Sequence, residues 1–415
     1  MVRRSPADGR SGETTAIPFI MLPFIISAAT LGLTTPPVVL YRRPISVVQF
    51  TGADRKRFLH GLCTVDVNSL AGCAETAVVD AAGNALDLLT LLDGADEDSL
   101  LALGDGGRGA ELAQFFDKYA FPADQVEVSD ASERHAGCCL EIAGPMAKEL
   151  LSAHVAESLP PPGGVVSIAD GLVLGAGSLG FAESYALLLS DDAAAEASHA
   201  VLATAVGAVD GGVVSPSWEE LRMRRGRPAR GAEYAAEHAP KASPLSLGLW
   251  GCVTPDKGCY LGNEVLVRLA RAKRQQLELY GVKLEEGDSV PSLGDSIVIV
   301  DDEKPEGDPF AQPQGVITSV NSGEDDGESP FALALLRPQA AKIGVRVKAG
   351  GAACGEVVDL PFAVRFREGL GGDGGESEGG DAAAEAKAAA KAAEAERKAK
   401  KMAAMQAKLK EMGLA

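Results

Sequence analysis

Apolar and polar residues follow two successive patterns along the chain. Between about residues 45 and 270, short β-rich runs are separated by stretches in which apolar residues recur with a helical period. Ser217, at the start of one such stretch, is a typical N-cap residue. Interleaved strands and helices predict an α+β domain over 45–270. The expected strands are 45–50, 77–79, 86–92, 126–128, 172–174 and 185–189, and the expected helices are 54–62, 108–119, 146–155, 192–206 and 217–225.

The helical period disappears from about residue 275 to 367. Short strands separated by Gly, Pro and Asp are expected there, at 277–284, 296–300, 315–320, 331–335, 345–347 and 356–359. Regularly spaced short strands with turn residues between them indicate a small antiparallel β-barrel. The length of 415 residues suits two domains better than one.

The amino-terminal segment has the features of a targeting signal. Three arginines within the first ten residues precede an uncharged run at 17–33 that contains small residues near its end. This arrangement predicts a targeting or signal segment over residues 1–40. The run is short for a transmembrane helix and two prolines interrupt it, so we expect no membrane association after removal of the signal.

The carboxyl-terminal end contains no core-forming pattern. Residues 369–380 are rich in Gly, Asp, Glu and Ser and predict a linker. Residues 381–415 are rich in Ala, Lys and Glu and predict a helix. A solvated single helix is the favoured interpretation; the alternative is that its Met and Leu stripe docks on a partner.

The overall charge disfavours nucleic acid as a partner. The formal net charge is −19, and because the last 35 residues contribute +3, the rest of the chain carries −22. Binding to a phosphate backbone needs a concentrated basic face. A small anionic ligand held by a few local arginines is compatible with this charge.

The cysteines show neither a disulfide nor a metal pattern. There are seven of them, an odd number, and none has paired metal-ligand spacing. We therefore expect no metal site and no iron–sulfur cluster bound by the chain itself. Free thiols suit a reducing compartment such as a plastid stroma or, alternatively, a mitochondrial matrix.

The segment at 257–264 combines a thiol, a cation and two glycines. It reads Lys-Gly-Cys-Tyr-Leu-Gly-Asn-Glu. The thiolate is the reactive form of cysteine, and Lys257 next to it favours that form. Gly258 and Gly262 allow positive φ or close approach of the backbone to a ligand. Cys259 is thus a candidate catalytic thiol; the alternative is a tight turn before a buried element.

This segment resembles the Lys-Gly-Cys-Tyr-x-Gly-Gln-Glu signature of the YgfZ branch of the glycine-cleavage T-protein (aminomethyltransferase) superfamily. Asn263 replaces the signature glutamine and is one methylene shorter. Further matches occur in the same order along about residues 45–367, and several look most like the plant chloroplast group of transferases. They are Phe-Leu-His at 58–60 within the opening 50–70, Ala-Gly-Pro at 143–145, Gly-Ser-Leu-Gly-Phe at 177–181, Trp-Glu-Glu-Leu-Arg at 218–222, Gly-Arg-Pro at 226–228 and Gly-Leu-Trp at 248–250.

The resemblance implies a folate-binding region of ferredoxin-like α+β units followed by a β-barrel, with tetrahydrofolate or a derivative as cofactor. Trp218 offers a flat face to a pterin, or is a core residue. One arginine of the 222–227 cluster, Arg224 in our prediction, would hold a folate carboxylate. The remaining candidate binding residues are Lys257, Gly258, Tyr260, Gly262, Asn263, Glu264 and Arg268, with Arg268 four residues after Glu264 and able to pair with it on a helix.

Asp87 is the second candidate catalytic residue. Aminomethyltransferases carry a Gly-Gly-x-x-Asp-Asp segment whose carboxylate acts near the folate nitrogen. The corresponding stretch at 83–88 keeps Asp87 and has Leu88 in place of the other acid. A carboxylate beside a protonated amine suits general acid–base transfer of a one-carbon unit. The alternative is an ordinary polar residue on a half-buried strand.

Three functions follow from these features. The first is a tetrahydrofolate-binding protein of the YgfZ type that supports iron–sulfur protein assembly or repair in an organelle, preferably the plastid, with Cys259 as its thiol. Its partners would be folate and iron–sulfur client or assembly proteins. The second is a folate-dependent one-carbon transferase, for which Asp87 is the main support. The third is a non-catalytic scaffold that binds a partner through the carboxyl-terminal helix.

Overall fold

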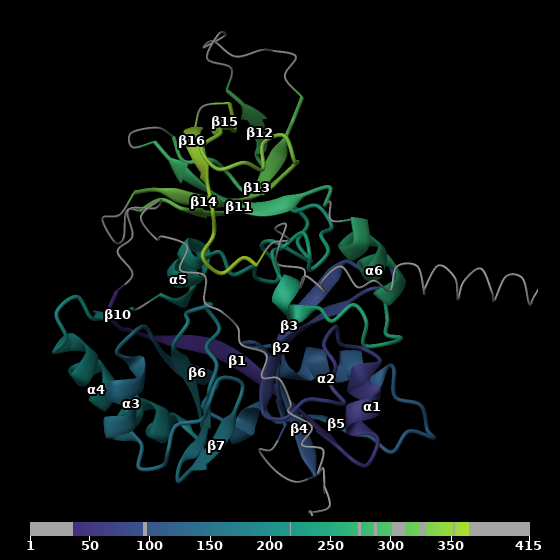
Figure 1. The fold of residues 1–415 in the computed structure, drawn as a ribbon, viewed down its shortest axis with the longest axis vertical. Helices are drawn as coiled ribbons and strands as arrows, with labels where there is room; N and C mark the ends of the chain where they lie inside the picture. Colours follow the sequence, from purple (N-terminus) through teal and green to yellow (C-terminus); the bar gives the residue numbers. More distant parts are fainter. Residues whose placement is uncertain are drawn as a thin grey trace, which may run out of the picture. The chain divides into compact units, whose positions relative to one another are not determined.

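A computed structural model describes residues 36–93, 98–215, 217–272, 275–285, 289–300, 312–323, 329–351 and 353–364. All of these belong to one compact unit. They form a ten-stranded sheet with helices, followed by a closed six-stranded barrel (Figure 1). The prediction of an α+β region followed by a small antiparallel barrel is confirmed. The targeting segment up to residue 35, the linker 369–380 and the tail 381–415 lie outside the described residues.

The long strand β1 (Val39–Thr51) is central to the first sheet. Its first half pairs with β6 (Cys138–Ala143) and β10 (Val213–Val214), and its second half with β4 (Ser99–Asp105) and β5 (Glu127–Asp130). The main path runs β2-β3-β4-β1-β6-β9-β8-β7. The other strands on it are β2 (Cys73–Val79), β3 (Ala85–Asp93), β7 (Val165–Ile168), β8 (Gly171–Leu174) and β9 (Ser184–Leu189).

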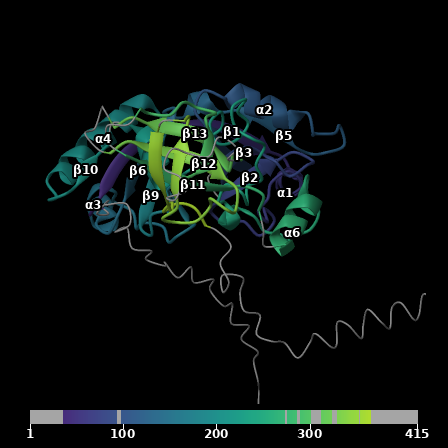
Figure 2. The ribbon, with the colours of Figure 1, turned by 90° about the horizontal axis from the view of Figure 1, so that it is seen from above.

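Four helices cover one face of this sheet in two pairs. α1 (Arg55–His60) and α2 (Gly109–Asp117) contribute Phe58 and Phe116 to a core with Phe50, whereas α3 (Ala147–His154) and α4 (Asp192–Gly207) pack on the half that contains β6 and β9. Figures 1 and 2 show the α1–α2 pair and the α3–α4 pair on opposite sides of the unit. The 3-10 turn η2 (Ser132–Arg134) follows β5.

Alternation along β1 defines a second face, which we call the inner face. Leu40, Val48 and Phe50 pack against the helices, whereas Tyr41 and Ile45 point to the other side. Successive side chains of a strand point to opposite faces, so Arg43 shares the inner face with Tyr41 and Ile45. Polar residues, among them Tyr41, Arg43 and Glu141, lie on this face.

The barrel is built entirely from antiparallel pairs. Its strands close in the order β11-β14-β13-β12-β15-β16. Alternate residues of β14 face the barrel interior or pack against Met223 and Tyr234 of the preceding region. The strands are β11 (Glu278–Leu284), β12 (Ser296–Ile299), β13 (Gly315–Asn321), β14 (Phe331–Leu336), β15 (Arg346–Ala349) and β16 (Ala353–Val358).

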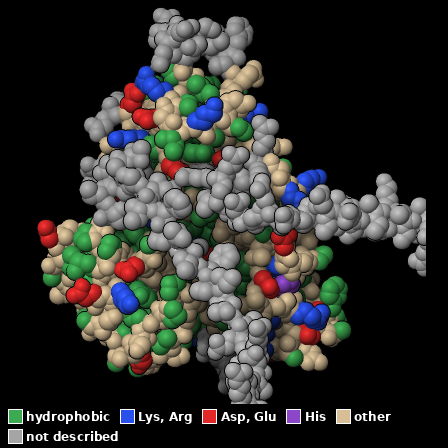
Figure 3. Space-filling model, in the orientation of Figure 1, with side chains coloured by type: hydrophobic (Ala, Val, Ile, Leu, Met, Phe, Trp, Pro, Cys, Tyr) green, Lys and Arg blue, Asp and Glu red, His purple; other side chains and the backbone are tan. Residues whose placement is uncertain are grey.

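Two helices connect the sheet and the barrel along the chain. α5 (Trp218–Arg225) begins at Ser217, whose side chain accepts a hydrogen bond from Glu220 N at 3.2 Å, as the capping prediction requires. α6 (Asn263–Ala272) follows the Lys-Gly-Cys-Tyr segment. Within the described residues, no helix has both the length and the apolar character needed to cross a bilayer. On the face drawn in Figure 3, the visible Lys and Arg side chains lie scattered among acidic ones.

Candidate functional site

Cys259 lies on an exposed loop between the 3-10 turn η3 (Trp250–Cys252) and α6. Gly258 and Gly262 have φ values of 114° and 78°, which favour glycine. A Cβ on Gly262 would lie 2.5 Å from Asp80 O, so the loop also packs closely on the turn between β2 and β3. Both glycines therefore shape the loop that presents the thiol.

Hydrogen bonds attach this loop to the carboxyl-terminal end of α1. The two motifs, Phe-Leu-His and Lys-Gly-Cys-Tyr, are about 200 residues apart in the sequence and adjacent in the fold. The bonds are Leu261 N to Gly61 O (3.0 Å), Thr254 N to Thr64 O (2.9 Å), Thr64 Oγ1 to Cys252 O (2.5 Å), and His60 Nε2 with Lys257 O (3.2 Å). The backbone around Cys259 is thus held on both sides of the thiol.

Lys257, two residues before Cys259, is bonded to the carboxyl-terminal end of α1. Its ammonium group donates to His60 O and lies 4.6 Å from the centroid of the Tyr260 ring. Burial lowers the pKa of Lys257 to about 8, although Cys63 and Asp66 oppose the shift. A half-buried ammonium needs an acceptor, and the last carbonyls of a helix supply one. Lys257 is thus held by α1 and the Tyr260 ring; its effect on the Cys259 thiol stays a prediction.

The other motif residues fall into two groups. Tyr260 is buried, burial raises its pKa to about 12, and its hydroxyl has no hydrogen-bond partner among the described residues. Asn263 donates through its amide to Gly258 O at 3.2 Å and so closes the loop. Glu264 and Arg268 are exposed on α6, and no ion pair joins them. The predicted pairing of these two side chains is not found.

Asp87 lies in a charged network at the start of β3. Arg108 Nη1 donates to its carboxylate at 2.7 Å, and Arg108 also binds Glu111. Arg230 contacts Glu111 at 3.2 Å and donates to Leu86 O at 2.8 Å. Burial raises the pKa of Asp87 to about 6, while Arg108 opposes the shift. A carboxyl group that titrates there can exchange a proton near neutral pH.

The arginines of the 222–227 cluster bond mainly to the protein. Arg224, the predicted ligand, pairs with Glu220 at 3.2 Å. Arg225 donates to Leu179 O and stacks 4.0 Å from the centroid of the Phe181 ring. As expected, side chains two and three apart on a helix point in different directions.

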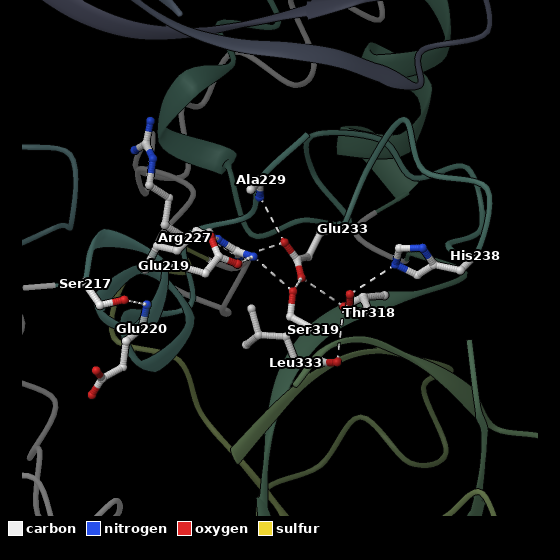
Figure 4. A network of polar contacts seen from close by, with 11 residues as sticks. Ser217, Glu219, Glu220, Arg227, Ala229, Glu233, His238, Thr318, Ser319 and Leu333 are labelled. Atoms are coloured by element: carbon white, nitrogen blue, oxygen red, sulfur yellow. Dashed lines mark hydrogen bonds and ion pairs between the residues drawn. The ribbon is translucent and has the colours of Figure 1, made fainter. Parts of the chain in front are cut away.

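Figure 4 shows Glu233, Thr318 and Ser319 pointing toward one another in a polar network. The buried Arg222 belongs to this network, which links α5 to the barrel. Its partner Glu233 is completely buried and lies 3.0 Å from Arg222 Nη1. Every acceptor position of this carboxylate is used, so the network serves structure rather than ligand binding. The remaining donors to Glu233 are Ala229 N (2.9 Å), Thr318 Oγ1 (3.1 Å) and Ser319 Oγ.

A second polar cluster on the inner face was not predicted from the sequence. Tyr41 donates to the buried Glu141 at 2.7 Å, and Ser178 donates to the same carboxylate through its backbone N (2.7 Å) and its hydroxyl (2.8 Å). Trp218 stacks on Tyr41 at a centroid distance of 5.9 Å. Arg43 completes the cluster. The usable signal in the sequence was a charged residue inside an otherwise apolar strand, as Glu141 is in β6.

The described residues contain no group of three or more His, Cys, Asp or Glu side chains that could hold a metal ion. The structure presents three candidate places for chemistry: the loop with Cys259, the buried polar cluster of the inner face, and the Asp87 network.

Comparison with known proteins identifies the fold. No protein-family model matches the chain. Its fold is similar to that of the glycine cleavage system aminomethyltransferase T from Bartonella henselae, with a TM-score of 0.60 and 18% identity, over 80% of this chain and 88% of that one. The fold is that of an aminomethyltransferase.

A second relative is known from its sequence. The chain is 29% identical over 326 residues to a putative chloroplastic transferase of Arabidopsis thaliana, which covers 77% of this chain and 69% of the relative. Both similarities agree with the superfamily resemblance noted in the motifs. Assignment to the YgfZ branch remains a prediction.

Proposed function

We propose that the chain binds tetrahydrofolate or a derivative and supports iron–sulfur protein assembly or repair, with Cys259 as the working thiol. The exposure of Cys259 carries this proposal. All seven cysteines are described: Cys259 is exposed, Cys138 and Cys354 are half-buried, and the others are buried. The sulfur presented to solvent is therefore the one in the motif, on a loop whose backbone is fixed.

The aminomethyltransferase fold supports folate as the cofactor, and one motif residue fits a pteridine. The buried Tyr260 hydroxyl has no protein partner among the described residues, and leaving such a group unpaired is unfavourable. A pteridine ring carries donors and acceptors that could meet it. Bound tetrahydrofolate would supply a one-carbon unit carried on nitrogen; the chain's residues would bind and orient it.

Calorimetric titration of the full-length protein with tetrahydrofolate tests cofactor binding. We expect saturable binding, weakened about tenfold in Tyr260→Phe, because one buried hydrogen bond is lost. Tyr119→Phe is the matched control, since Tyr119 is exposed. Absence of any binding to the unmodified protein would defeat the folate proposal.

Complementation tests the thiol. Cys259→Ala should fail to restore growth under oxidative stress in a bacterial strain that lacks its homologue of this chain, whereas the half-buried Cys138→Ala should restore it. Wild-type growth with Cys259→Ala would exclude the role of the thiol. It would not affect the proposal that the chain binds folate.

Folate-dependent one-carbon transfer is the second candidate, favoured by the pKa of about 6 at Asp87. Such a carboxyl group could donate or accept the proton of an amine during transfer. Asp87→Asn should abolish turnover while tetrahydrofolate still binds. Unchanged turnover in this variant would rule out the carboxyl as the acid–base group.

We also propose a plastid location, with the mitochondrion as the alternative. The name of the Arabidopsis relative gives it as chloroplastic. A fluorescent fusion to residues 1–40 should direct the reporter to plastids; accumulation in mitochondria would contradict this.

A further inference from the structure

Arg43 is a buried cation whose hydrogen-bonding capacity is largely unused. It lies on β1, faces the inner side of the sheet and is only 3% exposed. Its Nε and Nη2 atoms are buried and have no hydrogen-bond partner in the described part of the chain. Buried polar groups are nearly always hydrogen-bonded. Two unpaired nitrogens on one buried guanidinium therefore indicate that an acceptor from outside the chain binds there.

The nearest anion, Glu141, does not fill this role. Glu141 Oε1 lies 3.7 Å from Arg43 Nη1, too far for a hydrogen bond. Tyr41 and Ser178 hold the Glu141 carboxylate through the bonds given above. The ion pair is consequently loose, and it involves Nη1 rather than the free nitrogens.

The other arginines of this region already have partners: Arg225 donates to Leu179 O. Arg227 donates to Ser178 O at 2.6 Å and to Glu75. It is also buried, so it cannot turn to a second anion without leaving Glu75 unpaired. A ligand bound here would therefore be held by Arg43.

The geometry of the free atoms identifies the ligand chemistry. Nε and Nη2 form one edge of the planar guanidinium, and this edge matches the two oxygens of a carboxylate in a bidentate pair. A phosphate fits less well. It offers more acceptors than the two free nitrogens can satisfy and carries up to two charges beside Glu141, with Asp105 on the same face cross-strand from Ile45.

We propose that Arg43 binds the carboxylate of a small ligand on the inner face of the sheet. The enclosed position favours a compact molecule such as an amino acid or a short carboxylic acid. This inference deepens the proposed function, and rests on it in one respect: the carboxylate compound would be the second reactant beside the folate. The binding site itself does not depend on folate.

Thermal unfolding of the full-length protein with acetate as the probe tests the site. Acetate replaces chloride at constant ionic strength, and inorganic phosphate is the second probe. We expect the unfolding midpoint to rise saturably with acetate, because a ligand bound to the folded state stabilises it. In Arg43→Lys the apparent affinity should fall about tenfold, since an ammonium cannot form the bidentate pair.

Arg42→Lys is the matched control. Arg42 is the adjacent residue, points to the opposite face and pairs with Glu196 on α4 at 2.7 Å. The unfolding midpoint of Arg42→Lys should rise with acetate as it does in the unmodified protein. Glu141→Gln, which removes the neighbouring negative charge, should bind acetate several-fold more tightly; this variant keeps the site testable should Arg43→Lys fail to fold.

Three results would overturn the proposal. The midpoint of the unmodified protein could be insensitive to acetate, which would assign the free nitrogens to water. The midpoint could rise with phosphate and not with acetate. The shift caused by acetate could also be equal in Arg43→Lys and in the unmodified protein. Tetrahydrofolate titration is read separately: saturation by acetate without folate binding would defeat the proposed function and leave the carboxylate site standing.

Discussion

Cys259 and the buried cysteines differ in their access to solvent, and this difference predicts their reactivity. Under native conditions iodoacetamide should alkylate Cys259 at least about tenfold faster than Cys63, Cys139 or Cys252, because buried thiols are shielded and burial raises their pKa values. Mass spectrometry after short exposure measures the rates. Cys259→Ser should remove the fast phase and Cys63→Ser should keep it. Faster labelling of any buried thiol would contradict the structure.

The raised pKa of Asp87 predicts a pH-dependent stability. Folding raises this pKa from 3.8 to about 6, so the contribution of the protonated carboxyl is complete below about pH 4 and is lost as the pH rises through 6. Relative to the unmodified protein, Asp87→Asn should gain on the order of 2–3 kcal/mol in unfolding free energy between pH 4 and 7. Urea unfolding at several pH values measures this.

The control for this pH effect is Asp117→Asn, an exposed carboxylate at the end of α2. It measures the effect of removing a carboxylate from the surface, and the change at Asp87 is read relative to it. A difference for Asp87→Asn that does not vary with pH would show that the ion pair with Arg108 outweighs burial.

Residue chemistry was predictable where it depended on local sequence. The cap at Ser217 and the glycine-hinged presentation of Cys259 follow from neighbouring residues alone. The environments of Lys257 and Arg43 do not, because each depends on groups far away in the chain: His60 for the first, and Glu141 for the second. From the sequence alone, an arginine in a strand is predicted to lie on the surface, because its partners are not known.

At the scale of elements, the loop at 257–264 provides a matched pair of glycines. Gly258→Ala should cost roughly 1–2 kcal/mol through its positive φ alone, because a Cβ there meets nothing within 4 Å. Gly262→Ala should cost more, because its Cβ would also meet Asp80 O at 2.5 Å. Urea unfolding measures both. Equal costs would mean that the loop does not pack on the β2–β3 turn as described.

Helix positions followed from the sequence more closely than strand positions. The five expected helices begin and end within two residues of their observed ends. Strand β1 begins at Val39, whereas the apolar pattern placed its start at residue 45, because Arg42, Arg43 and Pro44 interrupt the run. Those residues belong to the strand since Arg43 is buried on the inner face and Arg42 pairs with α4.

At the scale of the whole molecule, the arrangement of the strands could be anticipated only through the family resemblance. β1 pairs with four strands, and the segments it joins lie up to about 170 residues apart in the sequence. Periodicity identifies a strand but carries no information about its partner. The motif matches supplied that missing information, and the structural similarity to an aminomethyltransferase confirms the fold they implied.

The connection between α5 and the barrel depends on one buried carboxylate. Glu233→Gln should lower the unfolding free energy by about 3 kcal/mol, because it leaves Arg222 buried without its enclosed counter-ion. Glu219→Gln is the matched control: Glu219 binds the same Arg222, but its side chain is 61% exposed, so its loss should cost less than about 1 kcal/mol.

Urea unfolding of both variants distinguishes a buried link from a surface pair. Ser319 and Thr318 of β13 also lose an acceptor charge in Glu233→Gln, because both hydroxyls donate to Glu233. The larger cost of Glu233→Gln should therefore come from the lost contacts with the barrel as well as from the loss of one partner of Arg222. Equal costs for the two variants would place the energetic contribution on α5 alone and leave the barrel attached by its apolar contacts with Met223 and Tyr234.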